Sequence, residues 1–458
     1  MRKSFFAYAV IVTVLLTAFL LPPLFGLTIE QQRTLLLLIL AIILWSSEVL
    51  PTGISALWII GLEMALGVSD SFASAVQGFL YSSLYFILVV ALIGSTITKV
   101  GLDKQLAAFI VHAARGKLHR VAQSVFVATV LLPLIMPSGN ARVQMFVPLV
   151  EQIGKSYPDG QRIPFQRFSI WTLSGVNQLA TVSVLSGGGF AVLASQLAVE
   201  LDVKTDWLHW LLLMAPPIWL ACLGTGLVMW RYWKIAAKTS AIAEMNVAPQ
   251  AAKTQDNKSF WIVSFSLAAL IITWIAVPNL PIILPPLLLV GLFAMPGIGL
   301  LDNRDLRNYD WENFILLGTA LSLAFTIEQN GTADWLVGLL LSLLGPRLPE
   351  WLYVVVLLVV TIAIRMLFTT PPAALTALYP LVKSYALWTG LNPAHSFLLA
   401  VMVSVGTVIL PIHSPIMYFA YKTGHLPFRQ HLFVSIAMLF CTMLAGLGAY
   451  WFYWPWIS

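Results

Sequence analysis

Long apolar runs separated by short polar segments account for almost the whole chain. Runs of this length with few charges are typical of membrane-spanning helices. We predict such helices at residues 5–27, 34–49, 52–68, 85–100, 207–230, 260–277, 281–295, 314–326 and 432–454. The more polar segments 69–81 and 302–310 are expected at the membrane interface. The pattern therefore predicts an all-α polytopic membrane protein, with residues 1–32 as an N-terminal transmembrane helix.

Two apolar regions, 121–150 and 351–385, are interrupted by small, polar and helix-breaking residues. The interruptions share a spacing of ten positions between a hydroxyl residue and a proline: Ser138 before Pro148, and Thr370 before Pro380. Such residues are costly at membrane depth unless they line a cavity. Paired interruptions at matching positions of two halves point to the binding site of a transporter. We interpret both regions as re-entrant hairpins.

Two further apolar runs contain breaks. The run 168–199 is broken by Ser-Gly-Gly-Gly at 186–189, and the run 393–421 by Pro-Ile-His-Ser-Pro at 411–415. Breaks of this kind divide a long span into two half-helices.

The second half of the chain repeats the landmarks of the first half in the same order. The offset is about 230 residues, and the matched pairs are Gly101 with Gly331, Ser138 with Thr370, and Gly187 with His413. We therefore predict two repeats, residues 33–230 and 260–458, joined by a cytoplasmic linker at 231–259.

The distribution of Lys and Arg predicts the orientation. If the N-terminus is cytoplasmic and each hairpin returns to its own side, most basic residues face the cytoplasm, as the positive-inside rule requires. Four basic residues lie outside in this arrangement: Arg33, Lys204, Arg347 and Lys383. Two others, Arg142 and Arg365, lie within the hairpins. The first hairpin then enters from the cytoplasm and the second from outside. This predicts two inverted-topology repeats with about 11 transmembrane helices plus two re-entrant hairpins.

Composition excludes several classes of function. Hydrophobic residues make up 59% and charged residues 10% of the chain, which excludes a soluble domain. The net charge of +6 follows from the orientation of the loops and does not imply nucleic acid. No HExxH pattern or nucleophile elbow occurs, so we do not expect an enzyme. Acidic residues within the spans are few, which disfavours the alternative of a cation/proton antiporter or channel. A secondary transporter of small anions is the leading interpretation.

The hairpin tips and helix breaks supply the candidate substrate-binding residues. Helix N-termini and free backbone N–H groups favour an anion. The candidates are Ser138, Gly139, Asn140, Arg142, Gly187, Gly188, Thr370, Pro371, His413, Ser414 and Pro415. An Arg at membrane depth is a functional candidate by default, although Arg142 could instead snorkel or pair with a carboxylate. His413 could bind the anion, carry a proton, or bond only to a neighbouring backbone group. For Arg365 a structural role is favoured.

The chain resembles the divalent anion/sodium symporter family over nearly its whole length. The resemblance rests on Trp-Ser-Ser-Glu-Val-Leu-Pro at 45–51, the Gly101 segment, residues 138–142 ahead of Pro148, and residues 410–415 ahead of Thr423 and Gly424. It implies transport of dicarboxylates, tricarboxylates or sulfate by an elevator-type mechanism. It also implies a homodimer in the inner membrane, in which a moving transport domain holds both hairpins.

The resemblance further implies sodium held at a hairpin tip and the facing loop, with Ser138, Asn140 and Gly187 as possible ligands. The family's Ser-Asn-Thr triplets read Ser-Gly-Asn at 138–140 and Thr-Pro-Pro at 370–372 here. Leu134 and Met366 stand where the family has a further hydroxyl. Coupling by sodium, by protons or by anion exchange therefore stays open. We expect weak sodium dependence, and anion binding that strengthens as pH falls below about 6.5 through His413.

Overall fold

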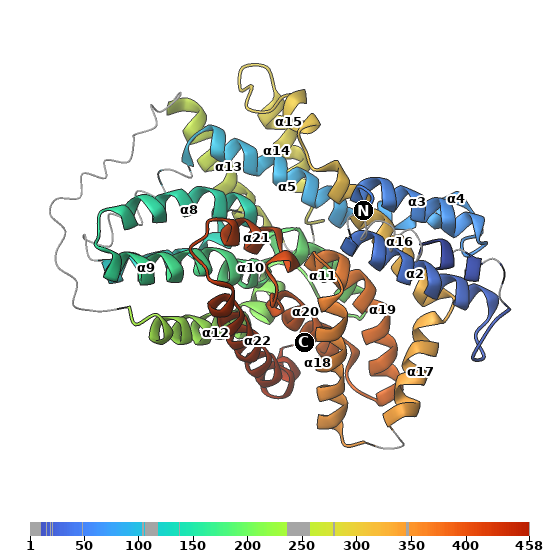
Figure 1. The fold of residues 1–458 in the computed structure, drawn as a ribbon. Helices are drawn as coiled ribbons and strands as arrows, with labels where there is room; N and C mark the ends of the chain where they lie inside the picture. The colour runs from blue at the N-terminus through green and yellow to red at the C-terminus, as the bar shows by residue number, and fades with distance from the viewer. Residues whose placement is uncertain are drawn as a thin grey trace. The chain divides into compact units, whose positions relative to one another are not determined.

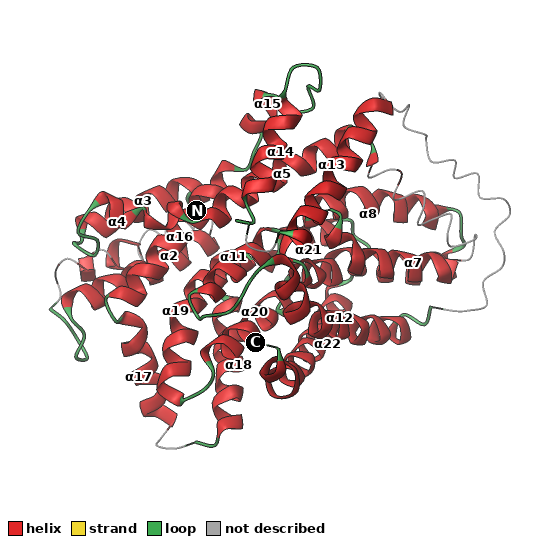
Figure 2. Ribbon diagram, turned by 180° about the vertical axis from the view of Figure 1, so that it is seen from behind, coloured by secondary structure: helices red, strands yellow, loops and turns green. Residues whose placement is uncertain are grey.

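The computed structural model describes residues 11–457 apart from 15, 19, 21, 48, 103–104, 106–117, 137, 236–256, 278–279 and 345–347. Most of the linker predicted at 231–259, and part of the N-terminal helix predicted at 1–32, lie outside the described residues. All regular structure in the described part of the chain is helical (Figure 2). The all-α prediction is confirmed.

Several of these helices have the length and composition of membrane spans. Within the described residues there are five: Ile29–Ser47, Ser82–Lys99, Trp207–Tyr232, Lys258–Ala276 and Phe428–Trp456. Shorter apolar helices lie at Thr52–Ala65, Leu118–Leu134, Gly189–Val199, Leu284–Ala294, Thr332–Leu344 and Pro393–Gly406. Both groups belong to a polytopic membrane protein.

The chain forms two compact units, each assembled from separate stretches of sequence. Unit 1 contains residues 1–84 and 310–404, and unit 2 contains residues 85–309 and 405–458. Each unit therefore combines parts of both predicted repeats. The first interrupted region belongs to unit 2 and the second to unit 1.

Unit 1 is organised around α16 (Trp311–Gln329), which packs against α2, α3, α17 and α19. The short α4 and the 3₁₀ turn at 77–80 also contact α16. At Gly78 the two segments meet so closely that a Cβ atom would lie 2.3 Å from the Gly318 carbonyl oxygen. The remaining bounds are α2 Ile29–Ser47, α3 Thr52–Ala65, α4 Phe72–Ala75, α17 Thr332–Leu344, α18 Glu350–Met366, α19 Pro371–Thr389 and, up to residue 404, α20 Pro393–Gly406.

Unit 2 holds the longest helix pair, α12 (Trp207–Tyr232) and α22 (Phe428–Gly448), which lie side by side (Figure 1). In a second group of helices in unit 2, α9 packs against both α7 and α8. The other bounds are α5 Ser82–Lys99, of which residues 85–99 belong here, α7 Leu118–Leu131, α8 Gly139–Lys155, α9 Asp159–Trp171, α10 Asn177–Ala180, α11 Gly189–Val199, α13 Asn257–Ala276, α14 Leu284–Ala294, α15 Asn303–Arg307 and α21 Pro415–Lys422.

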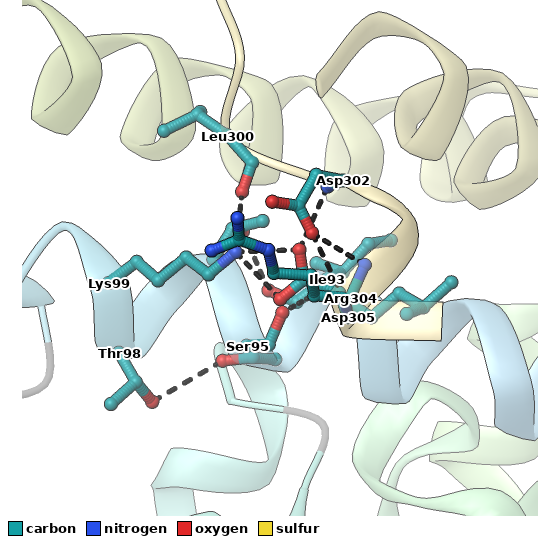
Figure 3. Close-up of polar contacts among 11 residues, drawn as sticks. Ile93, Ser95, Thr98, Lys99, Leu300, Asp302, Arg304 and Asp305 are labelled. Atoms are coloured by element: carbon teal, nitrogen blue, oxygen red, sulfur yellow. Dashed lines mark hydrogen bonds and ion pairs between the residues drawn. The ribbon is translucent and has the colours of Figure 1, made fainter. Parts of the chain in front are cut away.

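A polar contact fixes the end of α5 to the segment around α15. Lys99 Nζ lies 2.6 Å from one carboxylate oxygen of Asp305 and donates to the Leu300 carbonyl at 3.0 Å (Figure 3). Burial alone raises the pKa of the Asp305 carboxyl. Hydrogen bonds from Lys99 and from backbone N–H groups, with the Lys99 charge, outweigh this and hold the pKa below its ordinary value.

Two glycines that the repeat places at matching positions share an unusual backbone conformation. Gly101 follows α5 with φ 75°, and Gly331 follows α16 with φ 73°. Both lie in the left-handed region, which glycine enters without steric cost.

Candidate functional site

The first hairpin tip, which we define by Met136 and Ser138, lies between a short 3₁₀ turn and α8. The turn covers Leu132–Leu134, and Ser138 is the N-cap of α8. The Ser138 hydroxyl accepts a hydrogen bond from the Ala141 N–H at 3.2 Å. Ser is a preferred N-cap because its oxygen satisfies a first-turn donor. The tip therefore carries the N-terminus of α8, a helix of 17 residues. A helix N-terminus is a site that favours anions.

Arg142 is anchored beneath this tip and is only 1% exposed. Its Nε donates to Asn177 Oδ1 at 2.6 Å, and its Nη2 donates to Thr181 Oγ1 at 2.7 Å. Its Nη1 donates to the Met136 carbonyl. In the part of the chain that the structure describes, the hydrogen-bond acceptors of the guanidinium are neutral oxygens. Among the described residues, no carboxylate pairs with it.

Gly139 is the first residue of α8 and lies against the residues that surround Arg142. Its carbonyl accepts from Asn177 Nδ2 at 3.0 Å. A Cβ atom at Gly139 would lie 2.8 Å from Ile416 Cδ1 and 3.6 Å from Arg142 Nη2. A larger side chain is therefore excluded unless these neighbours move. Asn140, the next candidate, is exposed.

The break in the first long span packs against the start of the same tip. The chain leaves α10 at Ala180 and resumes as α11 at Gly189, so residues 181–188 form the first break. A Cβ atom at Gly187 would lie 2.3 Å from the Thr181 carbonyl oxygen and 3.1 Å from Pro133 Cβ. This contact requires glycine. Gly188 is extended, with φ 170°, a conformation open to any residue.

The break in the second long span, residues 407–414, also lies in unit 2. Ser414 is the N-cap of α21 and accepts from the Met417 N–H at 3.4 Å, and Pro415 is the first helical residue. His413 is 2% exposed, and its Nδ1 accepts from the Leu410 N–H at 3.4 Å. The helix α21 packs against α8. Unit 2 thus brings the first tip together with both breaks.

The second tip, Phe368 to Thr370, belongs to unit 1. Thr370 is the N-cap of α19, but Pro371 and Pro372 have no N–H to donate. The buried Thr370 hydroxyl oxygen has no hydrogen-bond partner within the described residues. Arg365 is fully buried beside this tip and donates to the Phe368 carbonyl at 2.7 Å and the Ser404 carbonyl at 3.0 Å.

The two buried arginines play parallel parts. Arg142 bonds the carbonyl two positions before the N-cap of α8, and Arg365 bonds the carbonyl two positions before the N-cap of α19. Each also bonds the span that follows its hairpin. The structural role of Arg365 stays a prediction.

Three residues of this region escaped the sequence reasoning. Asn177 and Thr181 surround Arg142, and His431 donates from Nε2 to the Ile409 carbonyl at 3.2 Å. Asn177 and Gln178 are adjacent amides within an apolar run, a signal that could have drawn attention to them. His431 lies one residue before the predicted start of the last span. A polar residue is ordinary at the end of a span, so the sequence gives no signal there.

Comparison with known proteins shows the family to which the chain belongs. The model of the family described as "Sodium:sulfate symporter transmembrane region" matches residues 2–458. The chain belongs to this family. The resemblance inferred from the motifs is thereby confirmed, and this sodium:sulfate symporter family member is a small-anion transporter of the membrane and not an enzyme.

Individual relatives of this family member are distant. A membrane protein of Cupriavidus necator is 24% identical over 97% of this chain and 92% of its own length. The L-tartrate/succinate antiporter of Escherichia coli K12 is 20% identical over 84% of this chain and 81% of its own length. The chloroplastic dicarboxylate transporter 2 of Spinacia oleracea is 21% identical over 61% of this chain and 52% of its own length.

Proposed function

We propose that this chain is a secondary transporter of small dianions, with dicarboxylates as its main substrates. The observation that carries the proposal is the cluster in unit 2, where the capped N-terminus of α8, the buried guanidinium of Arg142 and the Gly187 break come together. Helix N-termini and a guanidinium are suited to carboxylate and sulfate oxygens. Two relatives are named for dicarboxylate or tartrate/succinate transport, which supports the same substrate class.

We propose that the mechanism is elevator-type alternating access between two inverted-topology repeats, residues 33–230 and 260–458. The matched φ angles of Gly101 and Gly331 and the parallel contacts of Arg142 and Arg365 support the repeat. We further propose about 11 transmembrane helices with two re-entrant hairpins and a cytoplasmic N-terminus. The proposed assembly is a homodimer in the inner membrane.

The substrate site is proposed to use the first tip and both breaks, through Ser138, Gly139, Asn140, Arg142, Gly187, Gly188, His413, Ser414 and Pro415. In unit 1, Thr370 and Pro371 are proposed as substrate-binding residues of the second tip. Within the described residues the Thr370 hydroxyl has no hydrogen-bond partner, which supports its availability for a ligand. Sodium, which the family description names, is one proposed coupling ion beside protons and anion exchange, with Ser138, Asn140 and Gly187 as the residues that would hold it.

Transport by purified protein in proteoliposomes tests the function. Labelled succinate, malate, citrate and sulfate are offered outside vesicles that contain buffer or the same unlabelled anion. We expect uptake of succinate and malate above that of protein-free vesicles, competed by unlabelled anion in excess. Absence of uptake for all four anions, with and without a sodium gradient and internal anion, would refute the proposal.

A further inference from the structure

Two buried rings each donate a hydrogen bond to the backbone of a break. Trp210 Nε1 donates to the Val182 carbonyl in the first break at 2.9 Å. His431 Nε2 donates to the Ile409 carbonyl in the second break at 3.2 Å. Both rings are fully buried. Because a helix that stops leaves its last carbonyls without intrahelical partners, and a buried carbonyl without a partner is costly, each ring stabilises the unwound backbone of its break.

The two rings occupy equivalent places in the predicted repeats. Trp210 is the fourth residue of α12, the helix that follows the first broken span. His431 is the fourth residue of α22, the helix that follows the second broken span. In both halves of the chain, the start of the next helix therefore supplies an N–H group to the break that precedes it.

The hydrogen bond of His431 also reaches a candidate substrate-binding residue. A peptide group is planar and trans, so its carbonyl and its N–H point in opposite directions. The carbonyl of the peptide group between Ile409 and Leu410 accepts from His431. The N–H of the same peptide group, which belongs to Leu410, donates to His413 Nδ1 at 3.4 Å. His431 thus fixes the peptide group that orients the His413 ring.

The His431 ring is held by other rings on several sides. Its centroid lies 6.5 Å from that of Trp171 on α9, 6.0 Å from that of Tyr421 on α21 and 6.5 Å from that of Phe428 on α22. Nε2 carries the proton, because a carbonyl can only accept a hydrogen bond. Within the described residues, Nδ1 has no hydrogen-bond partner. The ring is therefore packed in one orientation, with its N–H aimed at the second break.

We propose that His431 is a positioning residue for substrate binding. Through the peptide group between Ile409 and Leu410 it sets the orientation of His413, as Trp210 holds the first break from the equivalent place. The inference rests on the proposed function, because it takes the second break as part of the substrate site. Fixing a binding group in advance strengthens binding, because less conformational entropy is lost when the ligand arrives.

The variants separate the N–H donor of His431 from the space that its ring fills. His431→Leu removes the donor to the Ile409 carbonyl, and His431→Gln keeps an N–H at the end of its side chain. Thr442→Val is the matched control. The Thr442 hydroxyl is also buried on α22, but it donates to the Met438 carbonyl of the same helix at 2.8 Å, so its loss removes no bond to a break.

Nitrogen NMR of the full-length protein in detergent, with isotope-labelled histidine, tests the orientation of His413 without any anion. The His413 signals are identified by their absence from His413→Asn. We expect His431→Leu to shift the signal of His413 Nδ1. His431→Gln should keep it near the position in the parent, and Thr442→Val should leave it unchanged. Thermal unfolding of the same samples shows that each variant is folded.

Binding of labelled succinate to the same samples tests the consequence for the substrate. The affinity should fall at least about tenfold in His431→Leu, equivalent to about 1.4 kcal/mol, and by a smaller factor in His431→Gln. Thr442→Val should bind as the parent does. Trp210→Phe, which keeps a ring but removes the N–H, should also lower the affinity. Parent affinity in Trp210→Phe would overturn the equivalence of the two rings.

Two outcomes overturn the role of His431 and leave the proposed function intact. One is folded His431→Leu protein in which the His413 signals match those of the parent, and the other is folded His431→Leu protein that binds succinate as tightly as the parent. If His431→Leu does not fold, His431→Asn is judged by the same two results, because its side chain is too short to place an N–H where Nε2 lies. A parent that neither binds nor transports any of the four anions refutes the proposed function, and the NMR comparison still decides whether His431 orients His413.

Discussion

Asn177 joins the first broken span to the hairpin that precedes it by contacting Arg142 through its amide oxygen at 2.6 Å. The nitrogen of the same amide donates to the Gly139 carbonyl at 3.0 Å. One side chain thus fixes both ends of the first turn of α8. The tip and the break are consequently expected to move as one piece during transport, because separating them would leave buried donors and acceptors unpaired.

Gly187→Ala should disrupt the packing of the first break against the first tip. A Cβ atom would lie 2.3 Å from the Thr181 carbonyl oxygen, and overpacking of this kind costs about 1–3 kcal/mol. We expect a lower unfolding temperature and loss of succinate uptake in proteoliposomes. Gly291→Ala is the matched control, because a Cβ atom there meets nothing within 4 Å and alanine favours the helical state of α14. Equal uptake by both variants would contradict the close contact.

The sequence was most informative where a local rule places a residue. The ten-residue spacing singled out Ser138 and Thr370, and in the structure both residues are N-caps of helices. Pro148 and Pro380 then fall inside α8 and α19, as the ten-residue spacing requires. These features depend on neighbouring residues alone, so the sequence is sufficient to find them.

The contacts within unit 2 could not be found in the same way. The partnership of Arg142 with Asn177 and Thr181 depends on how α8 packs against the span that follows it, which periodicity does not encode. The breaks were expected at 186–189 and 411–415, but the helices end earlier, at Ala180 and Gly406. The segment between Gly406 and Pro411 contains Val and Ile, which give no turn signal.

The sequence reasoning also omitted the helix α17 (Thr332–Leu344). Its 13 residues are apolar but too short to cross a bilayer, so their length gives no signal of a membrane span. Its role becomes visible only through packing, since it contacts α2, α16 and α19 in unit 1. The division of the repeats between two compact units is likewise a property of tertiary packing.

Gly331→Ala should destabilise unit 1 through its backbone. The φ of 73° lies in the left-handed region, where an L-residue costs about 1–2 kcal/mol. Gly338→Ala, within α17 and with nothing near its Cβ position, should be neutral or slightly stabilising. Thermal unfolding in detergent compares the two. A Gly331→Ala variant as stable as Gly338→Ala would show that the left-handed turn is not required.

Substitution of His413 separates a structural role from a protonic one. Its Nδ1 accepts from the Leu410 N–H, so the neutral ring supports the second break. An Asn side chain can offer an acceptor oxygen in place of Nδ1 but cannot carry a proton. If the acceptor is what matters, His413→Asn should transport succinate nearly as well as the parent, and His413→Ala should not.

The pH profile of the same variants tests the expected contribution of a charged imidazole. If the imidazole carries a proton when the anion binds, binding by the parent should strengthen as the pH falls within the range of about 8 to 5 in which histidine side chains change charge. His413→Asn and His413→Ala should both lack this change. A parent profile that is flat across this range, or a change that persists in both variants, would assign the titration to another group.

The contact between Lys99 and Asp305 predicts a dependence of stability on acid pH (Figure 3). Because the folded-state pKa of Asp305 lies below its ordinary value of 3.8, the carboxylate contributes stability above that pH. The contribution disappears as pH falls through the lower folded-state pKa. Lys99 is 43% exposed at its side chain, so the pair should be worth no more than about 1 kcal/mol. Asp305→Asn should therefore unfold at a lower temperature than the parent near neutral pH, and the difference should vanish in acid. Asp159→Asn, whose carboxylate is 72% exposed and pairs with Arg162, should show a smaller difference. A gap between parent and Asp305→Asn that is unchanged in acid would mean that Asp305 acts through its shape and not its charge.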